Sequence, residues 1–339
     1  MAPLDPAVAA VRAAARGVPA WLASGQGVQP VSLLVACSGG PDSMALASAA
    51  RFVLPRRGVR VGLVTVDHQL QDGSAERARR VAAWAVDAGF APVRVETVKV
   101  GGRTGGPEAA ARDARYEALV AAARAENASA VLLGHTRDDQ AETVLLAMLR
   151  GAGLRGLAGM PVRRVRDGVA FLRPLLAVSR EQTRAACAAE DLPIWHDPHN
   201  SDPAYRRTQA RSLLADLSAQ LGPAVVGNLA RTAQLAGADA AALDALARRA
   251  ARRALVGGTP AGLSIDRLAR LPDAVRTRVL HAWARRLGVP GSALSHRHVL
   301  ALDALVTDWH GQGPVSLPGG LTVTRREGVL RAGPGTAGL

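Results

Sequence analysis

Cysteine and lysine are scarce in this chain of 339 residues. The scarcity of cysteine limits the kinds of site that the chain can form. The two cysteines, Cys37 and Cys187, are too few for a disulfide framework and lie outside any C-x-x-C metal motif. No apolar run reaches the length of a membrane-spanning helix, and the amino terminus lacks the basic and apolar regions of a signal peptide. We therefore expect a cytoplasmic protein that makes no contact with a membrane.

Lysine is nearly absent, yet the chain is strongly basic. All but one of its 42 lysine and arginine residues are arginine, Lys99 being the exception, and the formal net charge is +14. A GC-rich genome would replace lysine by arginine, but it would not create an excess of positive charge. The excess favours a polyanionic partner, with nucleic acid as the first candidate.

The first part of the chain alternates between strand and helix patterns. This rhythm predicts an α/β fold with an open, mostly parallel sheet and helices on both faces. Ligands of such sheets bind at the carboxyl ends of the strands. We expect strands over 31–37, 59–67, 93–100 and 130–133, and helices over 43–52, 75–88, 107–124 and 138–150.

The composition changes after Leu221, where alanine- and arginine-rich helical patterns begin. They cover 224–255 and 273–287, and a short β-like tail follows over 314–324. We place a catalytic domain at 1–221 and a smaller, mainly helical domain at 222–339. Its arginine pairs either face solvent or contact phosphates, and the sequence leaves both interpretations open. These pairs are Arg248-Arg249, Arg252-Arg253 and Arg285-Arg286.

The most informative segment runs from Ser38 to Ser43, with the sequence S-G-G-P-D-S, and includes the acid Asp42. It lies between the first expected strand and the first expected helix. Backbone N–H groups in such a turn and at a helix N-terminus bind anions. The spacing is not that of a Walker A loop, and an acid stands where that motif has lysine. An acid beside phosphates indicates a Mg²⁺ ion between them. A helix-capping turn is the simpler interpretation.

A second acidic segment follows the fourth expected strand, where Asp138 and Asp139 begin a helix. Acids in a first helical turn stabilise the helix dipole, which is the simpler interpretation. The functional interpretation is that one of Asp138 and Asp139 faces Asp42 and shares a Mg²⁺ ion with it, since Mg²⁺ on ATP takes one or two carboxylates. Asp67 and His68 lie at another strand end and would join the same site.

Three further patterns bear on function. Arg112 and Arg115 share a helix face and could bind phosphates, hold an RNA backbone or face solvent. The G-x-G-x-x-G pattern over 151–156 follows a helix rather than a strand, which argues against dinucleotide binding. Trp195 and Trp309 fit core positions better than base-stacking ones.

Taken in order, these segments resemble a known family. The S-G-G-P-D-S loop resembles the pyrophosphate loop of N-type ATP pyrophosphatases. Together with V-D-H-Q-L, A-R-D-A-R-Y, H-T-R-D-D-Q-A-E-T and R-G-A-G-L-R-G-L-A-G-M, it resembles the tRNA(Ile)-lysidine synthetase family over about Val31 to Leu214. The segment 196–202, with Tyr205 and the arginines after it, is also similar. Thr208 departs from the family, which often has asparagine there.

The resemblance implies a two-step ligation that needs ATP and Mg²⁺. The wobble cytidine of tRNA(Ile) with a CAU anticodon would be adenylated, and free L-lysine would then displace AMP. The implied catalytic residues are Asp42, Asp139 and Arg112, with Mg²⁺ on the two acids. The implied ATP-binding residues are Ser38, Gly39, Gly40, Pro41, Asp42, Ser43, Asp67, His68, Gly134 and His135, and the implied tRNA-binding residues are Arg115, Arg206, Arg207 and Arg211.

Two alternatives stay open at this stage. One is a tRNA thiolase with the same loop, which the isolated cysteines disfavour. The other is a non-catalytic RNA-binding protein on an ATPase fold, which the intact Asp42, Asp138 and Asp139 disfavour. The sequence also leaves open whether the chain forms a homodimer and where lysine binds.

Overall fold

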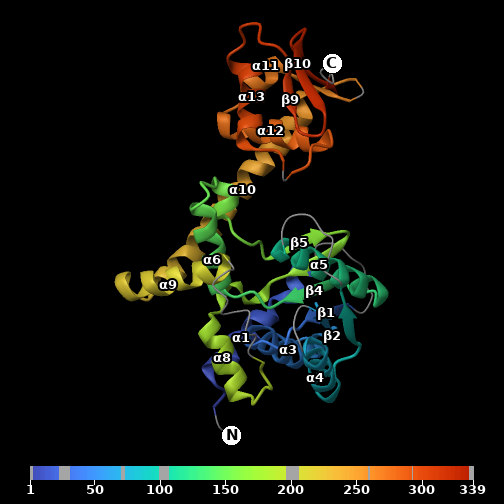
Figure 1. The fold of residues 1–339 in the computed structure, drawn as a ribbon, viewed down its shortest axis with the longest axis vertical. Helices are drawn as coiled ribbons and strands as arrows, with labels where there is room; N and C mark the ends of the chain where they lie inside the picture. The colour runs from blue at the N-terminus through green and yellow to red at the C-terminus, as the bar shows by residue number, and fades with distance from the viewer. Residues whose placement is uncertain are drawn as a thin grey trace. The chain divides into compact units, whose positions relative to one another are not determined.

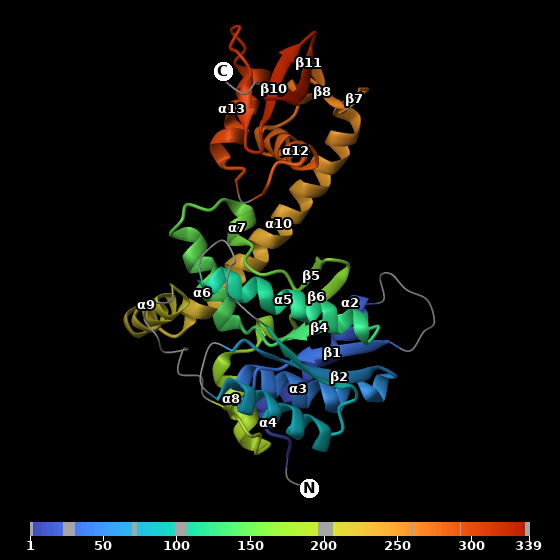
Figure 2. The ribbon, with the colours of Figure 1, turned by 45° about the vertical axis from the view of Figure 1, so that its right-hand side comes forward.

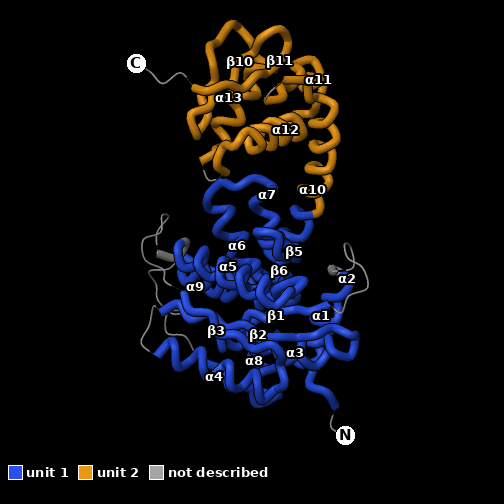
Figure 3. Tube along the Cα trace, turned by 90° about the vertical axis from the view of Figure 1, so that its right-hand side faces the viewer, with its two compact units in different colours: residues 1–237 blue, residues 238–339 orange. Residues whose placement is uncertain are grey.

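The computed structural model describes residues 3–22, 31–69, 73–98, 107–195, 206–258, 260–291 and 293–335. The motif expected over 196–202, Tyr205 and Lys99 lie outside the described residues. The chain forms two compact units, residues 1–237 and 238–339, and the division falls within the helix α10 (Ala224–Ala254) (Figure 3). No helix in the described ranges is long and apolar enough to cross a membrane.

Within the described residues, unit 1 contains one sheet of six strands in the order β3-β2-β1-β4-β6-β5 (Figure 1). Every neighbouring pair is parallel except β5 and β6. The prediction of an open, mostly parallel sheet is therefore confirmed. The strands are β1 (Ser32–Ala36), β2 (Arg60–Asp67), β3 (Val93–Thr97), β4 (Ala130–Leu133), β5 (Arg163–Arg166) and β6 (Val169–Leu172).

Helices cover both faces of this sheet, as expected (Figure 2). Alternate residues of β1 divide between the faces, because side chains point to opposite sides along a strand. Leu33 and Val35 join one core cluster, whereas Leu34 and Ala36 join the other. The first cluster includes α1 (Pro6–Arg16), α3 (Pro41–Val53), α4 (Ser74–Asp87) and α8 (Arg180–Ala189), and the second includes α5 (Pro107–Ala125).

The expected helices agree with the observed ones to within about two residues at most ends. The helix after β1 begins at Pro41 rather than Ser43, because proline suits the first helical position and Gly40 precedes it as the N-cap. The G-x-G-x-x-G pattern over 151–156 follows a helix rather than a strand, as expected, and the four-residue helix Leu154–Leu157 begins within it. The remaining helices of unit 1 are α2 (Val18–Leu22), α6 (Arg137–Met148), α7 (Leu154–Leu157), α9 (Arg206–Leu221) and two 3₁₀ turns (Pro55–Arg57, Pro174–Ala177).

Unit 2 is the smaller C-terminal domain, and it contains more β structure than the expected tail. Its described residues include five short antiparallel strands in the order β7-β8-β11-β10-β9. Trp283, Leu302 and Val323 lie in its apolar core. The strands are β7 (Leu255–Val256), β8 (Gly262–Ser264), β9 (Val315–Leu317), β10 (Leu321–Arg326) and β11 (Val329–Pro334), and the helices are α11 (Ile265–Ala269), α12 (Asp273–Arg286) and α13 (His296–Thr307).

Candidate active site

The loop between β1 and α3 is held in shape by its own groups. Gly39 adopts φ +85°, a conformation that favours glycine, and its carbonyl accepts a hydrogen bond of 2.8 Å from the Trp195 N–H. The Ser43 Oγ accepts from the Ser38 N–H at 3.1 Å and donates to the Gly40 carbonyl at 2.9 Å. No side chain caps the start of α3. The first N–H groups of this helix are therefore left for an anion.

Gly134 lets the end of β4 lie directly against this loop. A Cβ atom at Gly134 would stand 2.9 Å from the Asp42 carbonyl oxygen and 3.0 Å from the Ser43 Cα. Both neighbours are backbone atoms at the start of a helix, so they cannot move aside cheaply. The absence of a side chain at this position is what brings β4 and the residues after it close to Asp42.

A cavity of about 240 Å³ opens beside the loop, at the carboxyl ends of β1 and β2. Its apolar floor suits the face of a base, and its polar and cationic wall suits phosphates. The Arg77 guanidinium lies 4.2 Å from the Trp195 ring centroid in this wall. The lining residues are Ala36, Cys37, Ser38, Gly40, Val64, Val66, His68, Arg77, Arg115 and Trp195.

The two tryptophans do not occupy core positions. Trp195 is half-buried in the wall of the cavity, and Trp309 is 40% exposed, with Arg325 5.3 Å from its ring centroid. The expectation of core positions is therefore wrong for both. Their rings are partly covered by arginine side chains instead, which form favourable cation–π contacts.

A cluster of acids lies next to the loop and surrounds the guanidinium of Arg180. The Arg180 Nη2 is 2.9 Å from Asp139 Oδ1 and 3.0 Å from Glu142 Oε1, and its Nε is 3.9 Å from Asp42 Oδ2. Asp42 belongs to α3, whereas Asp139 and Glu142 belong to α6. The predicted convergence of Asp42 and Asp139 is therefore present, but a cation of the chain itself stands between them.

The first turn of α8 binds these acids with other groups as well. The Arg180 N–H donates to Asp138 Oδ2 at 2.8 Å, and the Thr183 hydroxyl donates to Asp42 Oδ1. Asp139 also caps its own helix, because its Oδ2 accepts from the Thr136 N–H at 2.8 Å and the Thr136 hydroxyl at 3.0 Å. Asp139 thus stabilises the start of its own helix, which was the simpler interpretation, and it faces Asp42 at the same time.

The acids of the cluster differ in how readily they ionise. The pKa of Asp42 is raised to about 6: burial is the main cause, the charges of Asp139 and Asp138 act in the same direction, and Thr183 and Arg180 only partly oppose them. Burial also acts to raise the pKa of Asp139, but Arg180 and the hydrogen bonds from Thr136 outweigh it and lower that pKa. Asp139 is the firmly ionised member of the pair, and Asp42 is the one that gains most from a further cation.

His135 is neutral at pH 7. The pKa of His135 is lowered to about 3: burial is the main cause, the charges of Arg173, Arg115 and Arg207 act in the same direction, and Asp139 opposes them. Its Nδ1 has no hydrogen-bond partner within the described part of the chain. The ring therefore cannot act as a cation toward phosphates, and it offers a neutral donor or acceptor at the end of β4.

The acid pair fits a magnesium ion that is shared with a nucleotide. A single guanidinium spans Asp42 and Asp139, so one cation can reach both carboxylates. Mg²⁺ on nucleotides usually takes one or two carboxylates and completes its shell with phosphate oxygens and water. The described residues contain no group of three or more metal-ligating side chains. Asp42 and Asp139 would thus hold the ion only together with phosphates.

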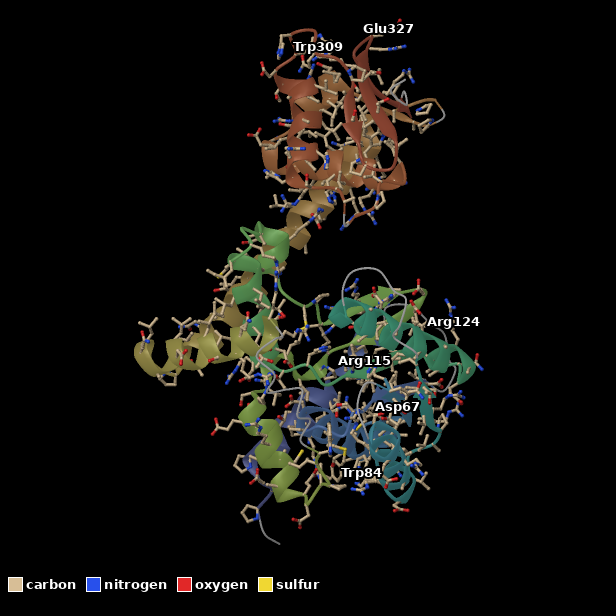
Figure 4. All side chains as sticks on the ribbon, viewed as in Figure 1. Asp67, Trp84, Arg115, Arg124, Trp309 and Glu327 are labelled. Carbon is tan, nitrogen blue, oxygen red and sulfur yellow. The ribbon has the colours of Figure 1, made fainter. Side chains whose placement is uncertain are left out.

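The two arginines of α5 are separated by the structure. Arg115 is half-buried in the cavity wall, whereas Arg112 is exposed and lies 5.9 Å from the Tyr116 ring centroid. Burial lowers the pKa of Arg115, and the charges of Arg207 and Arg112 lower it further. Asp67 is not among the described residues that line the cavity; its Oδ1 accepts from the Gln69 N–H at 3.0 Å and holds the turn after β2. Figure 4 labels Asp67 and Arg115.

The three arginines of α9 that the resemblance implies in tRNA binding differ in their surroundings. The Arg211 Nε forms an ion pair of 3.0 Å with Glu142, which connects α9 to the acid cluster. The charge of Arg207 affects the pKa of both Arg115 and His135, so Arg207 lies near the cavity. Arg206 is exposed at the start of the helix. Two of these three arginines thus accompany the site, and the third faces solvent.

Sequence reasoning missed Arg180, Thr183 and Glu142. A usable signal was present for Arg180, because Ser179 and Gln182 form a capping box that marks the start of α8. An arginine in the first turn opposes the helix dipole, which favours acids there. At Arg180 this unfavourable position is offset by acids of α3 and α6, which lie against its guanidinium.

Comparisons with known proteins agree with this site. Residues 18–217 match the family model of a PP-loop domain, and residues 263–331 match that of a TilS substrate binding domain. A solved structure, the U34-tRNA thiolase NcsA from Methanococcus maripaludis with its [4Fe-4S] cluster, has a TM-score of 0.53 and 15% identity, covering 67% of this chain and 79% of that one. At this identity the likeness concerns the fold alone.

Curated relatives match almost the whole chain. The tRNA(Ile)-lysidine synthase of Salinispora tropica is 60% identical over 98% of both chains. The enzyme of that name from Thermobifida fusca is 52% identical over 96% of this chain and 97% of its own. That from Streptomyces coelicolor is 53% identical over 89% and 85%. With a loop that leads into a helix without a side-chain cap, an acid pair beside it and relatives that match most of its length, the chain belongs to the tRNA(Ile)-lysidine synthase family.

Proposed function

We propose that this chain is a ligase that joins free L-lysine to the wobble cytidine of tRNA(Ile) with a CAU anticodon, at the expense of ATP. The observation that carries the proposal is the convergence of Asp42, Asp139 and the S-G-G-P-D-S loop beside a cavity suited to a nucleotide. ATP, tRNA and free lysine occur together in the cytoplasm, which is where we place the reaction.

The first step forms an adenylated cytidine. The C2 oxygen of the base attacks the α-phosphorus of ATP, and the bond from that phosphorus to pyrophosphate breaks. The uncapped N–H groups of α3 and the loop hold the leaving pyrophosphate, and Arg115 contacts the phosphates from the cavity wall. Mg²⁺, when bound to Asp42 and Asp139, neutralises phosphate charge. Arg112 lies one helical turn away from Arg115 on α5 and is exposed.

The second step transfers lysine. The side-chain amine, having lost a proton, attacks C2 of the base, and the bond from C2 to the adenylate oxygen breaks, so that AMP leaves. No side chain needs to act as a nucleophile, so positioning and charge stabilisation account for catalysis. A cluster-dependent thiolase is not favoured, because iron–sulfur clusters are usually held by four cysteines and this chain has two.

Unit 2 supplies a surface suited to an RNA backbone. A cavity of about 830 Å³ on this unit is lined by five exposed arginines above an apolar floor. Arginines bind phosphate oxygens in a fork geometry, and such contacts position a nucleic acid without reading its sequence. We propose that this cavity contacts the tRNA, together with Arg206, Arg207 and Arg211 of unit 1. The arginines are Arg249, Arg252, Arg253, Arg267 and Arg270.

The reaction is tested by incubating the protein with ATP, labelled lysine and a tRNA that carries the CAU anticodon. We expect lysine to enter the tRNA and AMP to form in equal amounts. AMP release that does not depend on lysine, with no label in the tRNA, would reject the ligase function. Asp42→Ala should abolish AMP formation and leave tRNA affinity nearly unchanged, whereas Asp87→Ala, which changes an exposed acid on α4, should behave as the parent.

The RNA surface is tested by the salt dependence of tRNA binding. Each phosphate contact adds about one unit to the slope of log affinity against log salt. Arg249→Gln and Arg252→Gln together should lower this slope by about two. Arg286→Gln with Arg297→Gln removes the same charge from exposed positions outside the cavity and should leave the slope nearly unchanged. Equal slopes in both pairs would place the tRNA elsewhere.

A further inference from the structure

Arg180 occupies a position that needs an explanation. It is the first residue of α8, where the helix dipole favours an anion. Its side chain is 13% exposed, and its guanidinium contacts Asp139 and Glu142 at 2.9 and 3.0 Å. The acids raise the pKa of Arg180 although burial acts to lower it. The side chain is therefore a permanent cation, placed among the acids that the proposed reaction requires.

The hydrogen bonds of the two acids show which of their oxygens Arg180 covers. One oxygen of each acid is held by a threonine: Asp42 Oδ1 accepts from Thr183, and Asp139 Oδ2 accepts from Thr136. The other oxygens, Asp42 Oδ2 and Asp139 Oδ1, are the ones that face Arg180. These are also the oxygens that remain for an external cation. A metal ion on both acids and the guanidinium in its present place would therefore compete for the same atoms.

Glu142 can hold the Arg180 guanidinium when its contacts with Asp42 and Asp139 are broken. Its Nη2 also contacts Glu142, whose side chain is 4% exposed and which Arg211 holds from α9 at 3.0 Å. Contact with Glu142 keeps the guanidinium within the cluster while the contacts to Asp42 and Asp139 are exchanged. The phosphates of a nucleotide add negative charge at this point, so that two cations can then be accommodated together.

We propose that Arg180 is a built-in competitor for the cation site. It neutralises Asp42 and Asp139 in the nucleotide-free protein, and a divalent cation replaces it on these acids only when a nucleotide contributes phosphate charge. Arg180 thus makes metal uptake depend on ATP and acts as a positioning residue. The proposal rests on the proposed magnesium site on Asp42 and Asp139.

Direct binding of Mn²⁺ alone tests the proposal, because free Mn²⁺ is measured by its electron paramagnetic resonance signal without any turnover. We expect Arg180→Gln to bind Mn²⁺ in the absence of nucleotide at least tenfold more tightly than the parent protein. A residue with a merely structural role would instead leave Mn²⁺ affinity unchanged or lower it. An equal or weaker affinity in the folded variant would overturn the proposal.

Arg211→Gln is the matched control, since it removes another guanidinium from the same Glu142. It should change Mn²⁺ affinity much less than Arg180→Gln, and an equal gain would reduce the effect to net charge and overturn the proposal. A non-hydrolysable ATP analogue should strengthen Mn²⁺ binding by the parent more than by Arg180→Gln. Equal strengthening of both would also contradict the proposed competition.

Two further variants cover the remaining outcomes. If Arg180→Gln does not fold, Arg180→Lys keeps the charge on a group that cannot span both acids, and it should still bind Mn²⁺ more tightly than the parent. Adding Asp139→Asn to Arg180→Gln should remove the gained site. Tight Mn²⁺ binding that persists in this double variant would place the ion elsewhere and reject the proposed magnesium site itself. Loss of tight binding would support that site, and the role of Arg180 would then be decided by the comparison of Arg180→Gln with the parent.

Discussion

Asp42→Asn should make the metal-free protein more stable at neutral pH while it abolishes AMP formation. The folded-state pKa of Asp42 is about 6, above its usual value of 3.8. The native state therefore binds the proton more strongly than the unfolded state does, and ionisation of this group costs stability. The cost is absent well below pH 3.8, grows as the pH rises and is complete above pH 6.

The magnitude follows from the shift. One pKa unit corresponds to about 1.4 kcal/mol, so ionised Asp42 costs about 3 kcal/mol at pH 7.5 and about 1 kcal/mol at pH 4.5. Asparagine keeps the acceptor for Thr183 and carries no charge, but it loses the contact with Arg180. We therefore expect a gain of about 1 to 3 kcal/mol at pH 7.5, which is smaller by about 2 kcal/mol at pH 4.5.

Urea unfolding, with a chelator present and no nucleotide, measures the free energy of unfolding of unit 1 in the parent and in Asp42→Asn at the two pH values. Thr183→Val is an informative companion, since it removes the hydroxyl that accompanies ionised Asp42 and should lower stability at pH 7.5. A gain for Asp42→Asn that is the same at both pH values would refute the assignment of the cost to ionisation. A loss of stability at pH 7.5 would show that Asp42 is held mainly by favourable contacts.

Three further predictions concern other parts of the molecule. Gly134→Ala places a Cβ atom 2.9 Å from the Asp42 carbonyl oxygen, so we expect a loss of about 1 to 3 kcal/mol in urea unfolding and slower AMP formation; unchanged stability would contradict the close approach. Arg115→Gln should weaken ATP binding about tenfold in calorimetry. Arg115 lies in the cavity wall and has no carboxylate partner among the described residues, so its charge is available to the phosphates. An unchanged dissociation constant would place the phosphates elsewhere. Arg276→Met leaves Asp303, whose side chain is 14% exposed, without the buried guanidinium now 2.7 Å away. Hydrogen exchange should therefore show unit 2 destabilised by about 3 to 5 kcal/mol while unit 1 still binds ATP, and unchanged protection in unit 2 would contradict this.

Local patterns predicted the central part of the site well. The apolar run before Ser38 and the proline at position 41 determine a buried strand followed at once by a helix, and these rules act within a few residues. The convergence of Asp42 with one of Asp138 and Asp139 followed from a rule of topology, since the ends of parallel strands meet at one edge of a sheet, and the family resemblance selected Asp139. Neither inference required knowledge of how any helix packs.

Packing decided what these rules could not. Arg112 and Arg115 share a helix face in the sequence pattern, and only the rotation of α5 against the sheet places one in the cavity and the other in solvent. The strands β7 and β8 were missed because two and three residues are too few for a clear pattern, and β8 also pairs with β11, which lies far away in the chain.

The sequence by itself thus determined the anion-binding loop, the acids beside it and the parallel sheet that brings them together. Only the tertiary structure placed Arg180 and Thr183 on these acids. That placement depends on how α8 packs against α1 and α3, where Glu190 accepts hydrogen bonds from Arg12 at 2.7 Å and from Ser48 at 2.5 Å. Capping and periodicity act between residues close in the chain, whereas an ion pair across the fold forms only where packing brings distant helices together.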